Sequence, residues 1–136
     1  PEIGWYEVAT TAPELIDAGP WFEWHVDAIT PPADATVLAT TGVCVQAYAI
    51  GPHLAVQFHP EVTDWNVGEW CATGTDALAE RGRSADALLA QTRVELPAAR
   101  RRAHDLVDRF LARAHKHTEH TEHTDHAATR SGAATP

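Results

Sequence analysis

Residues 54–62 read Leu54-Ala55-Val56-Gln57-Phe58-His59-Pro60-Glu61-Val62, an apolar run that ends in a base and a carboxylate. Side chains two positions apart on an extended segment point to the same face, so Glu61 can reach the imidazole of His59. Pro60 has a fixed φ and biases His59 towards extended geometry. A histidine oriented by a carboxylate forms two thirds of a nucleophilic triad, and α/β folds place such sites at strand ends.

Upstream of this segment the sequence predicts short strands separated by turn residues. Aromatic and β-branched runs are bounded by glycine and proline, and the last three runs follow one another closely. The expected strands are residues 4–9, 21–29, 36–41, 45–50 and 54–58. The last three are expected to be consecutive strands joined by tight turns.

Downstream the pattern changes to helix. Thr63 or Asp64 is a suitable N-cap for a first helix, whose apolar positions are Val67, Trp70 and Cys71. A second short helix is expected after Ser84. Pro97 suits the first turn of a last helix. The apolar stripe of that last helix consists of Ala99, Ala103, Leu106, Val107, Phe110 and Leu111.

The chain divides into a folded part and a tail. Residues 1–114 form the predicted domain, whereas residues 115–136 are rich in histidine and repeat with a period of three. Such a composition buries too little apolar surface to offset the entropy of ordering, so it predicts disorder. The histidines could chelate a divalent metal, but their spacing matches no structural zinc pattern. We therefore interpret the tail as solvated and expect no metal site and no cofactor.

Charge and composition exclude several partners. Residues 1–80 contain twelve acidic residues and no lysine or arginine, which excludes nucleic-acid binding through phosphate contacts. The run Arg100-Arg101-Arg102 is interpreted as the solvated face of the last helix. No apolar run is long enough to span a membrane, and no signal peptide is present. Two cysteines make no disulfide framework, so we expect a cytoplasmic protein.

Neither cysteine has the surroundings of a nucleophile. Cys44 has Gly42 two positions before it but Gln46 two positions after it, and a strand rather than a helix follows, so a nucleophile elbow is not indicated. Cys71 lies on the apolar side of a predicted helix and is expected to be core. His25 and Asp27 repeat the two-residue spacing of His59 and Glu61, and a hydrogen bond to a neighbouring loop is the commoner role of such a pair.

Taken together, these residues resemble the class I glutamine amidotransferases, within them the stand-alone branch similar to GMP synthase. An ordered series of short motifs carries the resemblance through some sixty residues, and the helical segment to about residue 113 fits the C-terminal end of that family. The motifs are Glu2-Ile3-Gly4-Trp5, Trp24-His25-Val26-Asp27, Pro31-Pro32 with Leu38-Ala39-Thr40-Thr41, Cys44-Val45-Gln46-Ala47-Tyr48, Gly51, and Gln57-Phe58-His59-Pro60-Glu61-Val62-Thr63.

The resemblance implies an α/β fold, namely the C-terminal portion of the flavodoxin-like amidotransferase fold, with a β-rich front, C-terminal helices and a disordered tail. It also implies hydrolysis of the glutamine side-chain amide by a Cys-His-Glu triad, with His59 as base and acid and Glu61 as its orienting carboxylate. His25 and Asp27 match a motif near the active site, for which only structural support is implied. The family's nucleophile elbow lies upstream of the matching segment, so we expect the chain alone to be inactive.

Three alternatives stay open at this stage. The chain, which begins Pro1-Glu2 without methionine, could be the back part of a longer enzyme or one piece of a split enzyme with a missing N-terminal half or a synthetase partner. It could instead be a non-catalytic remnant or binding module with metal affinity in its tail. The intact protein could also cleave γ-glutamyl bonds other than that of glutamine.

Overall fold

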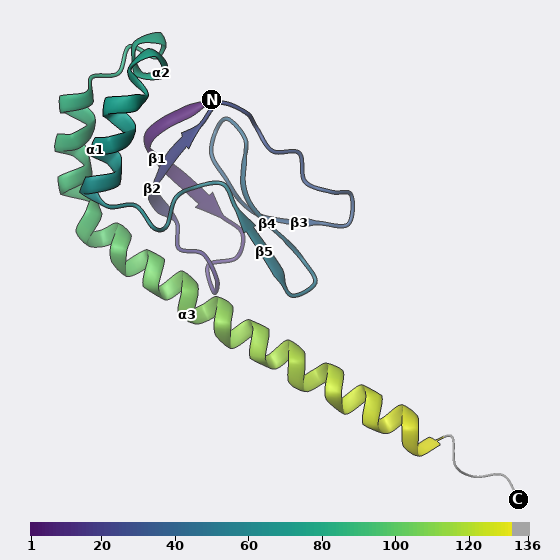
Figure 1. Ribbon diagram of the computed structural model, residues 1–136. Helices are drawn as coiled ribbons and strands as arrows, with labels where there is room; N and C mark the ends of the chain where they lie inside the picture. Colours follow the sequence, from purple (N-terminus) through teal and green to yellow (C-terminus); the bar gives the residue numbers. More distant parts are fainter. Residues whose placement is uncertain (132–136) are drawn as a thin grey trace, which may run out of the picture.

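The computed structural model describes the backbone of residues 1–131 and the side chains of residues 1–116. Five strands form one sheet in the order β2-β1-β3-β4-β5, and three helices follow (Figure 1). The strands are β1 (Glu2–Thr10), β2 (Gly19–His25), β3 (Thr36–Thr40), β4 (Val45–Ile50) and β5 (His53–Val56), and the helices are α1 (Asp64–Thr73), α2 (Thr75–Glu80) and α3 (Ala85–Ser131).

The sheet is antiparallel throughout and consists of two parts that share few backbone contacts. β1 and β2 pair along their whole length, from Glu2↔His25 to Val8↔Gly19. β3, β4 and β5 form a meander, which confirms the predicted succession of strands joined by tight turns. Only Ala9↔Thr40 and Thr10↔Ala39 connect β1 with β3. The sheet is therefore curled, and side chains must hold its two parts together elsewhere.

Two predicted strands end earlier in the structure than the sequence indicates. β2 ends at His25, and Ile29 forms only an isolated bridge with Val45. β5 ends at Val56. The prediction of an extended segment through Phe58 and His59 is therefore wrong at its end. The backbone bends there instead, because the N–H of His59 bonds the carbonyl of Phe22 on β2 at 2.8 Å rather than continuing the ladder with β4.

The helices cover the β1–β2 hairpin. α1 begins as predicted at Thr63, whose hydroxyl accepts a hydrogen bond from the N–H of Asn66 in a capping box. Val67 and Cys71 of α1 are buried in a core cluster with Ile3, Trp5 and Phe22 of the hairpin, to which α2 and α3 also contribute. A second core cluster, around Trp21 and Phe58, lies under the meander and the later part of α3. α2 has no counterpart among the predicted helices.

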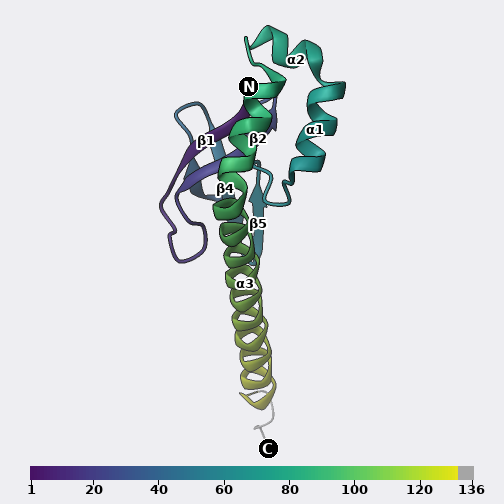
Figure 2. The same cartoon turned by 90° about the vertical axis from the view of Figure 1, so that its left-hand side faces the viewer.

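α3 is one helix where the sequence predicts two, so the predicted start at Pro97 is wrong. Proline in a helix interior removes one backbone hydrogen bond, yet packing on both sides of Pro97 maintains the helix. Leu88 before it and Ala99 after it belong to the same core cluster. In Figures 1 and 2 the helix passes across the strands and extends well beyond them.

The apolar stripe of α3 is only partly covered. Leu106 is buried and Phe110 packs against the second cluster, as expected. Val107 and Leu111, which belong to the same predicted stripe, are about half exposed at 51% and 49%. No helix among the described residues combines the length and hydrophobicity needed to cross a membrane.

The backbone of α3 is helical as far as Ser131, which differs from the disorder that composition predicts from about residue 115. No glycine or proline interrupts the sequence between Pro97 and Ser131, and a helix that has already started extends at low cost. Side chains 117–131 and residues 132–136 lie outside the described part of the chain, so the expectation of no metal site in the histidine tail, and the alternative that the tail binds metal, both stay untested.

Candidate active site

The structure brings His59 and Glu61 together. Nδ1 of His59 lies 2.8 Å from Oε1 of Glu61, and the two side chains are 28% and 60% exposed. The contact arises in a turn, in which the N–H of Val62 approaches the carbonyl of His59 at 3.4 Å, and not by alternation along a strand. Because an ionised carboxylate only accepts hydrogen bonds, Nδ1 carries the proton and Nε2 of the neutral ring keeps its lone pair.

Aromatic side chains and the backbone fix the position of the His59 ring. The ring lies 4.8 Å from that of Trp70 on α1 and 6.4 Å from that of Phe22 on β2, measured between centroids. Trp24 in turn packs on Trp70 at 5.9 Å. Together with the 2.8 Å bond from the N–H of His59 to β2, these contacts hold the imidazole on one side while leaving it partly exposed.

An open pocket of about 620 Å³ adjoins the imidazole of His59. Its wall includes Trp24, His25 and Asp27 from the end of β2 and Gln57 from the segment before His59. A small polar molecule placed there would have the imidazole at its edge. The pocket therefore offers room for a small molecule next to the imidazole of His59.

Neither Cys44 nor Cys71 is among the residues that line the pocket beside His59. The thiol of Cys44 lies 3.3 Å from Oε2 of Glu2, and burial together with the neighbouring Glu2 raises its pKa from 9.0 to about 11. Cys71 is buried in the core, where burial raises its pKa. A thiol with a raised pKa is a poor nucleophile, and the expectation that neither cysteine completes the pair stays a prediction.

His25 does not contact the Asp27 carboxylate through Nδ1 but contacts the backbone, and a hydrogen bond to a neighbouring loop was the expected role of this pair. Its Nδ1 lies 2.9 Å from the backbone carbonyl of Asp27 and not from the Asp27 side chain. The same carbonyl accepts a hydrogen bond from the Gln57 amide at 2.7 Å. These contacts tie the end of β2 to the segment that leads into His59, which is a structural role.

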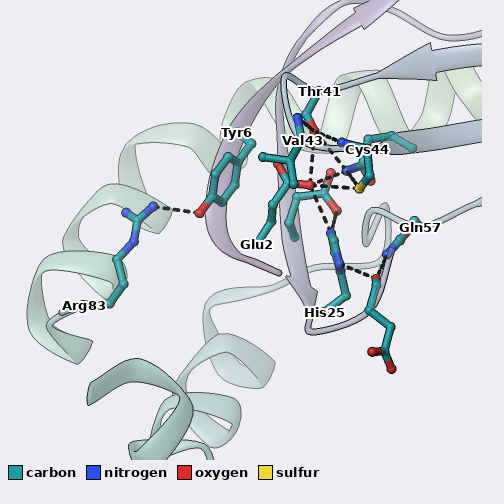
Figure 3. A network of polar contacts seen from close by, with 11 residues as sticks. Glu2, Tyr6, His25, Thr41, Val43, Cys44, Gln57 and Arg83 are labelled. Atoms are coloured by element: carbon teal, nitrogen blue, oxygen red, sulfur yellow. Dashed lines mark hydrogen bonds and ion pairs between the residues drawn. The ribbon is translucent and has the colours of Figure 1, made fainter. Parts of the chain in front are cut away.

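A buried polar cluster, which no sequence pattern indicated, adjoins His25 of this pocket (Figure 3). Oε2 of Glu2 accepts hydrogen bonds from the Gln46 amide at 2.6 Å and from the hydroxyl of Thr41 at 3.1 Å. Glu2, Glu23 and Gln46 are fully buried. Burial, and secondarily the neighbouring Glu2, raises the pKa of Glu23 from 4.5 to about 8. The pairing register of β1 with β2 sets Glu2 opposite His25, and knowledge of that register would have indicated the cluster.

Comparison with known proteins gives structural matches only, since no family model and no curated protein match this chain. A glutamine amidotransferase from Thermotoga maritima matches 80% of this chain and 50% of its own, with 27% sequence identity and a TM-score of 0.70. A glutamine amido transferase from Methylobacillus flagellatus matches 82% of this chain and 52% of its own, with 26% identity and a TM-score of 0.73.

These matches confirm the α/β fold and the resemblance that the ordered motifs indicate. The chain spans about half the length of the solved structures that it matches.

Proposed function

We propose that this chain supplies the base and its orienting carboxylate, His59 and Glu61, to a glutamine amidotransferase site that hydrolyses the side-chain amide of glutamine. The observation that carries the proposal is the 2.8 Å contact between Nδ1 of His59 and Glu61 beside an open pocket. The similarity to two glutamine amidotransferase structures supports the choice of substrate.

In the proposed reaction, Nε2 of His59 accepts the proton of a cysteine thiol, and the thiolate attacks the amide carbon. His59 then returns that proton to the leaving nitrogen, which departs as ammonia and leaves a glutamyl thioester. Water attacks the thioester with His59 again acting as base, which gives glutamate and restores the thiol. Glu61 touches no reacting atom. It is a positioning residue that keeps the Nδ1–H tautomer and stabilises the imidazolium.

The thiol in this scheme comes from outside residues 1–136. Cys44 is engaged by Glu2, and Cys71 is buried in the core, so neither reaches the pocket of His59. Loss of the nucleophile costs about 10⁶-fold in rate where this has been measured in another triad enzyme. The 136-residue chain alone therefore has no measurable glutaminase activity in this proposal.

The test is glutamine hydrolysis, followed as ammonia and glutamate release, by the chain alone and by a longer protein that carries the segment upstream of Pro1. The proposal expects no activity from the first and activity from the second. Glu61→Gln in the longer protein should lower kcat far more than it raises KM, since Glu61 orients the base and does not bind glutamine. Turnover of another γ-glutamyl amide with no turnover of glutamine would move the assignment to a γ-glutamyl hydrolase.

The proposed reaction also implies a partner, a requirement for cofactors and a cellular compartment. A synthetase that uses the ammonia is the expected partner of the longer protein, and no cofactor takes part in the chemistry. Both cysteines are unpaired, which fits the reducing environment of the cytoplasm.

A further inference from the structure

In the buried polar cluster, Nε2 of His25 and several carboxylate oxygens have no hydrogen-bond donor within residues 1–116. Nδ1 of His25 faces the carbonyl oxygen of Asp27, which only accepts, so Nδ1 carries the proton and Nε2 of the neutral ring is an acceptor. Nε2 nevertheless faces two further acceptors, Oε2 of Glu2 at 3.2 Å and Oε2 of Glu23 at 3.6 Å. A protonated Glu23 satisfies the longer of these contacts. The 3.2 Å contact between Nε2 of His25 and Oε2 of Glu2 still joins two acceptors, and only a proton or a metal ion between them reconciles it.

Several other oxygens of the cluster are also acceptors without a donor, which supports a bound cation. Oε1 of Glu2, both oxygens of Glu23 and Oε1 of Gln46 are buried and make no hydrogen bond within residues 1–116. Both glutamate side chains are fully buried, and a buried acceptor without a partner costs roughly 1–3 kcal/mol. A cluster with so many unpaired acceptors is unusual for a site whose only purpose is packing.

We propose that Glu2, His25 and Cys44 form a binding site for a divalent transition-metal ion, with zinc as the best fit. Their ligand atoms lie within 4.8 Å of one another: Oε2 of Glu2, Nε2 of His25 and Sγ of Cys44. Oxygen, imidazole nitrogen and thiolate sulfur are the ligand set of zinc in proteins. The site is separate from the His59–Glu61 pair, and it does not depend on the proposed amidotransferase function.

Two of the three distances between ligand atoms fit a tetrahedral ion, and the third, between Nε2 of His25 and Sγ of Cys44, is within 4.8 Å. With zinc bonds of about 2.0–2.1 Å to oxygen and nitrogen and about 2.3 Å to sulfur, neighbouring ligand atoms lie roughly 3.3–3.6 Å apart. In the structure Oε2 of Glu2 is 3.2 Å from Nε2 of His25 and 3.3 Å from Sγ of Cys44. Oε2 of Glu23, 3.6 Å from the same nitrogen, or a water completes the fourth position.

The surroundings of the three ligands match the outer shell of a metal site. The hydrogen bond from Nδ1 of His25 to a backbone carbonyl is the arrangement that presents Nε2 to a metal. The Gln46 amide donates to Glu2 and lies 3.3 Å from the sulfur of Cys44, so it supports both ligands. Cys44 is only half buried and follows the exposed Val43, which gives an ion a path of entry (Figure 3).

Coordination balances charge and links separate parts of the sheet. The Cys44 thiol releases its proton to solvent as the metal–sulfur bond forms, so one thiolate and the Glu2 carboxylate together neutralise a dipositive ion. Glu2 belongs to β1, His25 to β2, and Cys44 to the loop between β3 and β4. β1 and β3 share only two register pairs, so a bound ion would join the hairpin to the meander where the backbone ladder does not.

The test is a Co²⁺ titration of the 136-residue chain, followed by the charge-transfer absorption that only a cobalt–thiolate bond gives. The histidine tail contains no cysteine, so cobalt held there stays silent in this band. We expect the band to saturate at an intensity that corresponds to one cobalt–thiolate bond per chain, and Zn²⁺ to displace the cobalt. Cys44→Ser should abolish the band, and Glu2→Gln, which keeps shape and burial, should weaken binding by at least about tenfold. Cys71→Ser is the matched control and should keep the band.

Three results would overturn the proposal: no band at millimolar Co²⁺, a band that survives Cys44→Ser, or unchanged affinity in Glu2→Gln. Circular dichroism of each variant shows whether a lost band reflects a lost fold. If Cys44→Ser does not fold, the cobalt affinity of Glu2→Gln decides whether the site exists. Proton release on addition of Zn²⁺ to the unaltered chain reports independently on coordination by the Cys44 thiol. Release of no proton on binding would contradict coordination by the Cys44 thiol.

Discussion

The buried carboxyl group of Glu23 makes the stability of this protein depend on pH in a predictable way. Its side chain is fully buried, and burial with the neighbouring Glu2 raises its pKa from 4.5 to about 8. The folded protein therefore keeps a proton on Glu23 at pH 7, whereas the unfolded chain has released it. The contribution of Glu23 to stability is greatest below about pH 4.5, where both states are protonated, and falls as pH rises towards 8.

Glu23→Gln replaces this group with a neutral one of the same shape, so it should remove that loss. One pKa unit corresponds to about 1.4 kcal/mol, and pH 7 lies roughly 2.5 units above the unfolded value, so the variant should be more stable by about 3 kcal/mol at pH 7. Near pH 4.5 the two proteins should differ little. The other titrating groups are shared, and their contributions cancel in the difference.

Urea unfolding at several pH values measures this difference, with the fluorescence of the five tryptophans as the signal and a chelator present to remove metal. Glu7→Gln is the matched control, because Glu7 lies on the neighbouring strand β1 and is exposed. Its difference from the wild type should not change with pH. The reasoning is refuted if Glu23→Gln and the wild type differ by the same amount at pH 5 and pH 8.

Three other substitutions and one reaction probe the surroundings of the candidate site. Gly74→Ala, at the residue that caps the end of α1, should cost about 1–3 kcal/mol, since its Cβ would lie 2.6 Å from Trp24. Gly68→Ala, within α1, meets nothing within 4 Å and should stabilise the helix by up to about 1 kcal/mol; urea midpoints test both. Thr63→Ala removes the N-cap of α1 and should lower the unfolding free energy by about 1 kcal/mol, and an unchanged midpoint would contradict the role of the cap. Without metal at pH 7.5, Cys44 should react with iodoacetamide on the order of 100-fold more slowly than a cysteine of ordinary pKa, because its own pKa is about 11. Mass spectrometry measures the rate. A rate equal to that of an ordinary cysteine would contradict the raised pKa of Cys44.

Much of the architecture could be predicted from local patterns. Alternating runs bounded by glycine and proline indicated the strands, and Thr63 indicated the start of α1, because these features depend on nearby residues. Pro97 was misleading, since its local cost is outweighed by packing of Leu88 and Ala99 on either side of it. The end of β5 was also misplaced, because the hydrogen bond from His59 to Phe22 depends on a strand far away in the sequence.

The same distinction holds for the candidate site. The contact between His59 and Glu61 was predicted because it joins residues two positions apart, although a turn and not a strand produces it. The cluster of Glu2, Glu23 and His25 was not predicted, because acidic residues in a strand suggest a solvated face until the register of β1 with β2 is known. Contacts that combine several strands are visible only in the folded structure.

The most direct test of the central claim is the effect of His59→Ala on glutamine hydrolysis by a longer protein that carries the segment upstream of Pro1. The account predicts that ammonia release falls by at least about 10³-fold, because the general base is lost. His53→Ala, at an exposed position at the start of β5, is the matched control and should leave the rate unchanged. Equal activity of the His59→Ala variant and the unaltered protein would contradict the account.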